Sequence, residues 1–128
     1  MESAENKGED NIMIRKADEV TVEYREHMRG GPGTAQVTKF IAGDEELQNK
    51  GRLFAKITLV PGAGVGHHEH EKDSELFYIL SGTPDYEDNG KMVKLQPGDV
   101  TICPPGETHA ITNNTDEPVE VIAVIVYA

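Results

Sequence analysis

The sequence predicts an all-β fold, a double-stranded β-helix (jelly-roll barrel) in a single domain. Short segments rich in β-branched and aromatic residues recur between turn signals such as GGPG, DNG and PPG. No segment has helical periodicity over enough residues for a substantial helix. Short strands of this kind are typical of two packed antiparallel sheets. A chain of 128 residues is long enough for one hydrophobic core and one domain.

The chain begins with a polar, acidic segment. Residues 1–11, MESAENKGEDN, lack periodic apolar residues, and we expect them to form a disordered tail. Residues 12–128 are predicted to form the barrel. Its first extended segments are IMIR, VTVEYREHM and, after a turn at 30–33, TAQVTKFI. The following DEELQNKG is predicted to be one helical turn or a loop.

The segment RLFAKITLV, residues 52–60, has a clear alternation of apolar and polar residues. Leu53, Ala55, Ile57 and Leu59 share one face, which we expect to line the barrel interior. Lys56 then lies on the outer face. The glycine-rich stretch that follows, PGAGVG, supplies backbone freedom for a tight approach to the next histidines.

Three residues in the next stretch have the spacing of metal ligands. His68 and His70 are two residues apart, so on an extended strand both imidazoles lie on one face. After the charged turn EKDS, Glu75 opens the β-prone run ELFYIL, which is predicted to pair back against the histidine strand. His109, in a later extended stretch, is the fourth candidate. Three imidazoles and one carboxylate suit Mn, Fe, Ni, Zn or Cu(II) better than Ca or Mg.

The remaining histidines and the cysteine have structural interpretations. Alternation places His67 on the face opposite His68, and His27 lies in the charged segment YREHMR with no partner in range. Cys103 ends the strand VTIC without an activating base nearby in the sequence, so we expect it to be buried and structural.

The C-terminal half completes the strands. TPDYEDNGKMVKL is predicted to be a hairpin with its tip at Asp88-Asn89-Gly90, and Pro84 favours a position at a sheet edge or bulge. VEVIAVIVYA is nearly unbroken in apolar residues, which predicts a strand covered on both faces.

Two motifs make the chain resemble the cupin superfamily, in particular small single-domain cupins. The first is a glycine, five residues, H-x-H, four residues, a glutamate, six residues and a glycine. The second is a glycine, five residues, P-x-G, two residues, a histidine, three residues and an asparagine. Every fixed position is filled, by Gly62, His68, His70, Glu75, Gly82, Gly98, Pro104, Gly106, His109 and Asn113. The resemblance covers residues 52–126.

The resemblance implies one divalent transition metal, held by His68, His70, Glu75 and His109 in the mouth of the barrel. We expect manganese or iron, with zinc, nickel or copper also compatible. By alternation the pocket beside it is expected to be apolar, lined by Ala55, Ile57, Val65, Phe77, Ile79 and Ile111. The resemblance also implies a homodimer, in which the N-terminal β-strands pair with a second subunit. The alternative is that they close the chain's own sheet.

One position departs from the best-known activity of similar proteins. Small cupins of this type are often described as oxalate decarboxylase-like. Oxalate decarboxylases and oxidases carry Arg or Asn three residues before the first histidine of H-x-H, and here that residue is Val65. The polar group expected to orient oxalate for turnover is therefore missing from that position, although oxalate could still bind the metal.

Three functional hypotheses follow. The chain is a mononuclear metalloenzyme for a small oxygenated organic acid, carbonyl compound or phenol, with dioxygenase, decarboxylase or isomerase chemistry. Alternatively it is a non-catalytic module that binds or senses a small ligand or metal, or the metal is purely structural. The net charge of -11 argues against nucleic acid and anionic membranes as partners. A single cysteine and the lack of a long apolar run or signal peptide favour a cytoplasmic protein.

Overall fold

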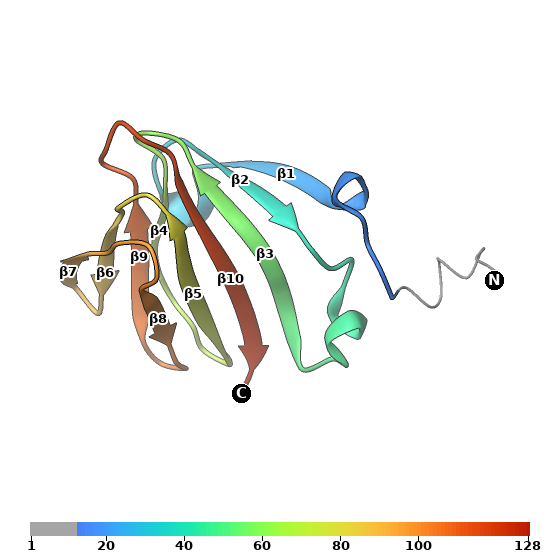
Figure 1. Cartoon of the computed structure of the whole chain (residues 1–128). Coiled ribbons are helices and arrows are strands. Elements are labelled where there is room, and N and C mark those ends of the chain that lie inside the picture. Colours follow the sequence, from blue (N-terminus) through green and yellow to red (C-terminus); the bar gives the residue numbers. More distant parts are fainter. Residues whose placement is uncertain (1–12) are drawn as a thin grey trace.

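The structure of the chain is a computed structural model that describes residues 13–128 (Figure 1). The predicted tail, residues 1–11, lies outside the described residues. Within residues 13–128 the regular structure consists of strands and three short 3-10 turns, η2 (Ala17–Glu19), η3 (Met28–Gly30) and η4 (Asp44–Leu47). The strands are β1 (Thr21–Glu26), β2 (Thr34–Lys39), β3 (Gly51–Leu59), β4 (Gly64–Glu69), β5 (Asp73–Ser81), β6 (Asp85–Asp88), β7 (Lys91–Lys94), β8 (Val100–Cys103), β9 (Thr108–Thr112) and β10 (Val119–Tyr127).

The strands form two antiparallel sheets, as the sequence predicts. The order is β1-β2-β3-β10-β5-β8 in the six-stranded sheet and β4-β9-β6-β7 in the four-stranded sheet. The two sheets curve around a common interior, with β6, β7 and β9 on the side opposite β3 and β10 (Figure 1). This is the jelly-roll architecture, in which each strand turns alternate side chains toward the core.

The predicted alternation of β3 is confirmed. Ala55, Ile57 and Leu59 are at most 1% exposed, whereas Lys56 lies on the outer face, where its Nζ is 3.2 Å from a carboxylate oxygen of Glu120. The central strand β10 differs from its prediction. It buries one face from Val119 to Ile125, but the opposite face, which includes Ile122, is only partly covered by the described chain. The prediction that this nearly continuous apolar segment is covered on both faces is therefore wrong for the outer face of β10.

The N-terminal strands join the chain's own sheet. β1 pairs with β2 and β2 pairs with β3, which leaves β1 at the sheet edge. The segment IMIR, expected to be extended, forms no strand within its described residues 13–15. Pairing of these strands with a second subunit stays a prediction.

The connection between β4 and β5 corrects the predicted pairing. The sequence predicted that the histidine strand and the glutamate strand form a hairpin. Instead β4 pairs with β9 in the four-stranded sheet, while β5 pairs with β10 and β8 in the six-stranded sheet. The turn between them crosses from one sheet to the other. Glu75 therefore reaches the histidines across the barrel interior and not from a neighbouring strand.

The hairpin predicted over residues 83–95 is confirmed. β6 and β7 pair directly, and Asn89 and Gly90 have φ angles of 51° and 89°, as a two-residue turn requires. β7 forms the edge of its sheet. In the part of the chain that the structure describes, no helix is long and apolar enough to span a membrane.

Candidate metal centre

The four residues predicted as ligands come together in the barrel. His68 lies on β4, His70 directly follows that strand, His109 lies on β9 and Glu75 lies on β5. The three Nε2 atoms are 3.2 Å from one another. Oε1 of Glu75 is 3.1 Å from Nε2 of His70 and of His109, and 3.7 Å from Nε2 of His68. All four donor atoms therefore surround one point, and they could hold a metal ion.

These separations fit coordination of a single ion. Nitrogen and oxygen donors at bond lengths of about 2.0–2.2 Å from one metal lie roughly 3.0–3.5 Å apart. A shell of three imidazoles and one carboxylate is suited to a divalent transition metal. The register of the sheets produces this convergence, because His68 on β4 pairs directly with His109 on β9.

The other nitrogen of each imidazole has its own partner. The Nδ1–H of His68 donates to the carbonyl oxygen of Gly66 at 2.7 Å, and that of His70 donates to Oδ1 of Asp73 at 2.7 Å. The Nδ1–H of His109 donates to the hydroxyl oxygen of Tyr86 at 2.8 Å. With Nδ1 protonated in each ring, the three Nε2 lone pairs point to the common centre. Such outer partners fix the tautomer and orientation of metal-binding histidines.

The electrostatics of the cluster favour an ionised carboxylate. Burial by itself would raise the pKa of Glu75, but the three histidines around its carboxylate, whose Nε2 atoms donate hydrogen bonds to it when they are protonated, outweigh burial and hold the pKa well below its usual range. The hydrogen bond to Glu75, together with that to Asp73, raises the pKa of His70 against the effect of burial. Burial lowers the pKa of His109. Glu75 is thus an anion beside three imidazoles, which is the charge state that a divalent cation needs.

Two outer residues connect the centre to its surroundings. Asp73 accepts from His70 through Oδ1 and from Nε of Arg52 through Oδ2 at 2.9 Å. Burial acts to raise the pKa of Asp73, but these two hydrogen bonds hold it below its usual range. Burial raises the pKa of Tyr86 to about 12, so its hydroxyl stays protonated at neutral pH. Neither Asp73 nor Tyr86 was predicted from the sequence to belong to the site.

A cavity of about 150 Å³ opens beside the centre, and His68 and Glu75 form part of its wall. Of the predicted pocket residues, Ile57, Val65 and Phe77 line this cavity. Ala55, Ile79 and Ile111 are buried in the core instead and do not line it. The wall also contains residues that were not predicted from the sequence to line the pocket: Arg25, Met28, Arg29, Lys39, Arg52, Leu53 and Ile125.

The basic residues are the largest difference from the expected apolar pocket. Arg25 and Lys39 come from β1 and β2, and Arg29 comes from η3 between them. The alternation in residues 52–60 puts Arg52 on the same outer face as Lys56, so it was not expected in the pocket. The pairing of β10 with β3 shifts between Ile125 and Val126, which leaves Arg52 as an extra residue opposite the shift. A β-bulge of this kind re-aims a side chain, and the sequence pattern contains no signal for it.

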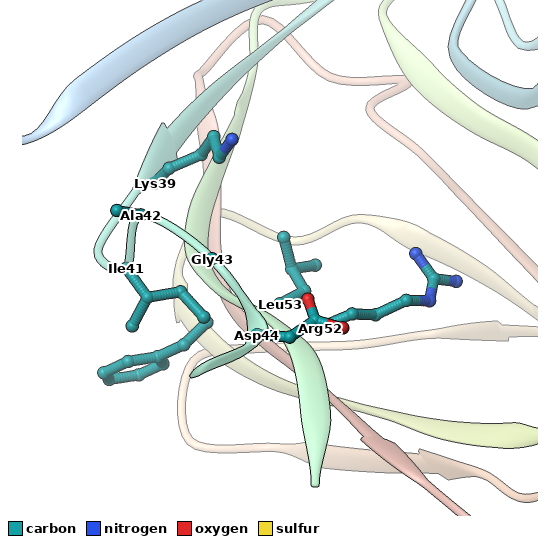
Figure 2. A pocket seen from close by; sticks show the side chains of 8 residues that line it. Lys39, Ile41, Ala42, Gly43, Asp44, Arg52 and Leu53 are labelled. Atoms are coloured by element: carbon teal, nitrogen blue, oxygen red, sulfur yellow. The ribbon is translucent and has the colours of Figure 1, made fainter. Parts of the chain in front are cut away.

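A second hollow adjoins the first. It has a volume of about 160 Å³ and shares Lys39, Arg52 and Leu53 with the wall of the first cavity. Figure 2 shows the charged ends of Lys39 and Arg52 extending away from the loop that carries Ile41 and Ala42. Lys39 and Arg52 therefore line both hollows.

The remaining histidines, the cysteine and the motif asparagine are not among the four candidate metal donors. His67 is exposed, and its Nδ1 is 2.7 Å from Oε2 of Glu87. His27 is exposed as well. Cys103 is 3% exposed, and burial raises its pKa to about 11. Asn113, a fixed position of the second motif, binds backbone carbonyls of Leu59 and Glu117 through Nδ2 and has a structural role.

Comparison with known proteins identifies relatives of this chain. The family model described as Cupin domain matches residues 55–125. An oxalate-binding protein of Thermotoga maritima is 40% identical over 114 residues, which cover 89% of this chain and 93% of that protein. A glucose-6-phosphate isomerase of Thermococcus onnurineus is 30% identical over 116 residues, covering 79% of this chain but only 59% of that protein.

Solved structures similar to this chain include further proteins of the same kind. The crystal structure of a predicted oxalate decarboxylase from Thermotoga maritima has a TM-score of 0.85 at 40% identity, covering 91% of this chain and 100% of that one. The cupin domain of an XRE family transcriptional regulator from Enterobacter cloacae has a TM-score of 0.63 at 26% identity, covering 73% of this chain and 97% of that domain.

Proposed function

Because this chain belongs to the cupin family, we propose that it is a mononuclear metal-binding protein that acts on a small oxygenated organic acid or carbonyl compound. In this proposal His68, His70, Glu75 and His109 hold one divalent transition metal, manganese or iron in the first instance. The organic acid occupies the adjoining cavity and reaches the metal from that side. Decarboxylase, dioxygenase or isomerase chemistry would follow.

One observation carries the proposal: the four donors meet at one point, and that point borders a cavity. Two of the donors, His68 and Glu75, form part of the cavity wall, whereas His70 and His109 are buried behind it. A ligand in the cavity would therefore lie directly against the metal site. A site enclosed on every side would instead favour a structural metal.

The residues of this chain have distinct parts in the proposed function. A divalent metal bound here would supply Lewis acidity or redox chemistry to the ligand. Gly66, Asp73 and Tyr86 orient the three imidazoles, and Phe77 stacks on His109 with ring centroids 5.2 Å apart. Within the described wall of the cavity, Glu75 and His68 are the only carboxylate and imidazole. No residue there is left to act as a separate general base, so the chemistry would depend on the metal.

The second candidate is a non-catalytic module that binds a small acid through its metal. The name of the oxalate-binding relative favours this candidate, because it describes binding and not turnover. The missing polar residue at Val65 favours it too. The two candidates share the metal site and differ in whether the bound acid is consumed.

Purified chain without a metal-chelating tag tests both candidates. Elemental analysis gives the bound metal, and calorimetry with oxalate measures binding to the native protein, the chelated protein and the His109→Ala variant. We expect oxalate binding in the native protein and its loss in the other two. Release of carbon dioxide or uptake of dioxygen identifies an enzyme, and binding without consumption identifies the module. Unchanged binding in His109→Ala would refute the proposed site.

We also propose that the chain forms a homodimer. The outer face of the six-stranded sheet exposes large apolar side chains on several strands, and an exposed apolar face of this kind is typical of an interaction surface. They are Tyr24, Phe54, Tyr78, Leu80, Val100 and Ile102, between 38% and 70% exposed. β1, with Tyr24, is both an edge strand and part of this face. Light scattering should find a dimer that Ile102→Glu converts to a monomer, and a monomeric native protein would refute the proposal.

A further inference from the structure

The wall of the cavity beside the metal centre has an unusual charge. The chain has 23 acidic and 12 basic residues in total. Among the residues that line the cavity, four are basic, Arg25, Arg29, Lys39 and Arg52, and one is acidic, Glu75. Glu75 is already directed at the metal centre. The cavity therefore reverses the charge balance of the whole protein at the place where a ligand would enter.

Ion pairs neutralise only part of this wall. Glu23 pairs with both Arg25 and Lys39, at 2.7 and 3.3 Å, so one carboxylate is shared by two cations. Asp73 pairs with Arg52 at 2.9 Å. Among the ion pairs formed within residues 13–128, none involves Arg29. Within the described residues the wall keeps an excess of positive charge, to which Arg29 contributes a cation that forms no ion pair there.

The backbone around Arg29 is held in an uncommon conformation. His27 and Arg29 both have left-handed backbone angles, with φ of 50° and 53°. Non-glycine residues seldom adopt this region, and they persist there where the surrounding structure fixes them, often at binding sites. Here the segment that directly follows η3 is fixed to β4, since the amide of Gly64 donates to the carbonyl of Pro32 at 2.9 Å.

Close packing of glycines holds the same turn beside the metal strand. A Cβ on Gly31 would lie 2.7 Å from the carbonyl oxygen of Gly64 and 2.7 Å from the amide nitrogen of Gly66. A Cβ on Gly66 would collide with the carbonyl oxygen of Arg29. Gly66 in turn accepts from His68. The position of Arg29 is thus tied to the strand that carries a metal donor.

The charged residues and the metal donors come from different parts of the chain. The match to the family covers residues 55–125, which include all four donors. Arg25, Arg29, Lys39 and Arg52 all precede it. The matched range therefore supplies the metal donors, and the segment before it, from β1 to the start of β3, supplies the charge that a ligand would meet.

We propose that Arg25, Arg29 and Lys39 recognise a second anionic group, a carboxylate or a phosphate, on an acid whose other end binds at the metal centre. The site then selects acids with two anionic groups over acids with one, with Arg29 as the main specificity-determining residue. This inference rests on the proposed function, because it assumes that an acid binds the metal. A cavity of about 150 Å³ matches the space of roughly five water molecules at ~30 Å³ each, which suits a compact acid.

Pairs of acids that share a metal-binding end test this selection. Malate is lactate with a second carboxylate, and 3-phosphoglycerate is glycerate with a phosphate. Calorimetry on the metal-loaded full chain should give tighter binding for malate than for lactate, or for 3-phosphoglycerate than for glycerate. Which pair shows the preference tells whether the second group is a carboxylate or a phosphate. Equal affinity within both pairs would overturn the inference.

Substitutions test whether the basic residues of the cavity wall cause the preference for an acid with a second anionic group. A hydrogen bond to a charged group is worth a factor of about 10 to 100 in affinity. Arg29→Gln should therefore weaken binding of the preferred acid with two anionic groups by about that factor, and leave binding of its partner with one anionic group within about twofold. Lys39→Gln is a second variant of the wall, for which we expect the same selective loss of binding. Lys56→Gln is the matched control, because it removes the same charge on the outer face, where Lys56 pairs with Glu120.

The outcomes separate this inference from the proposed function. If Arg29→Gln weakens binding of both members of a pair equally, recognition by the wall is refuted. The same holds if Lys56→Gln weakens binding of the acid with two anionic groups as much as Arg29→Gln does. Metal-dependent lactate binding without any preference for malate or 3-phosphoglycerate would refute the inference alone. If no acid binds, or if binding survives removal of the metal, both the proposed function and this inference fail.

Discussion

The hydroxyl of Tyr86 offers a direct test of how this chain orients its metal donors. Its oxygen accepts from Nδ1 of His109 at 2.8 Å, and the two residues are 5% and 1% exposed. Tyr86→Phe removes this one oxygen. The aromatic ring, which lies edge-on to Phe77 and to His109, keeps its place.

The size of the effect follows from the burial of His109. Without the hydroxyl, its Nδ1–H is a buried donor without an acceptor, which costs about 1–3 kcal/mol of unfolding free energy. Loss of an outer partner of a metal-binding histidine lowers metal affinity by about 10- to 100-fold, or ~1.4–2.8 kcal/mol. The metal-free and the metal-loaded protein should therefore both be destabilised.

Two measurements on the same preparations check this prediction. Denaturant unfolding of the metal-free protein gives the loss of stability, and competition with a chromophoric chelator gives the metal affinity. Tyr78→Phe is the control, because Tyr78 is 46% exposed on the outer face of β5. If Tyr86→Phe matches the native protein in both measurements, the hydroxyl does not orient His109 and the account of the outer partners is wrong.

Three further predictions concern packing, pH and the thiol. Gly66→Ala should destabilise the fold by about 1–3 kcal/mol, since its methyl group meets the carbonyl of Arg29; denaturant unfolding at native stability would contradict this. Bound metal, measured by elemental analysis after dialysis, should fall as the pH drops through the histidine range, because protons compete for Nε2. The raised pKa of His70 makes this competition start above the usual value of about 6.5, and full occupancy at about pH 4 would contradict it. Burial raises the pKa of Cys103 to about 11, so mass spectrometry should find iodoacetamide labelling at neutral pH only after denaturation, and rapid labelling of the native protein would refute the burial.

Local sequence patterns were sufficient for the strands and for the identity of the donors. The alternation in β3 correctly placed Ala55, Ile57 and Leu59 inside, because successive side chains on any strand point to opposite faces. The Asn89-Gly90 turn was also predictable from local sequence, because the conformation of a two-residue hairpin loop depends on the two residues that form it. The spacing of His68, His70, Glu75 and His109 pointed to a cluster that the structure brings together.

Pairing between distant segments was not predictable in the same way. Glu75 was expected on a strand beside His68, yet β5 lies in the opposite sheet. Both arrangements satisfy the same alternation, and only the order of strands distinguishes them. The prediction of the pocket residues was limited in the same way, because alternation does not tell which inward-facing residues line the cavity. Ala55, Ile79 and Ile111 face inward like the cavity residues but pack into the core.

The sequence by itself determined the all-β fold, the family and the four candidate donors, because these depend on periodicity and spacing along the chain. The tertiary structure alone decided the charge of the cavity. Arg25, Arg29 and Lys39 reach it through the pairing of β1 and β2 with β3, and Arg52 turns toward it at a bulge. The physical reason is that strand order and bulges are set by long-range pairing and packing, which local patterns do not encode.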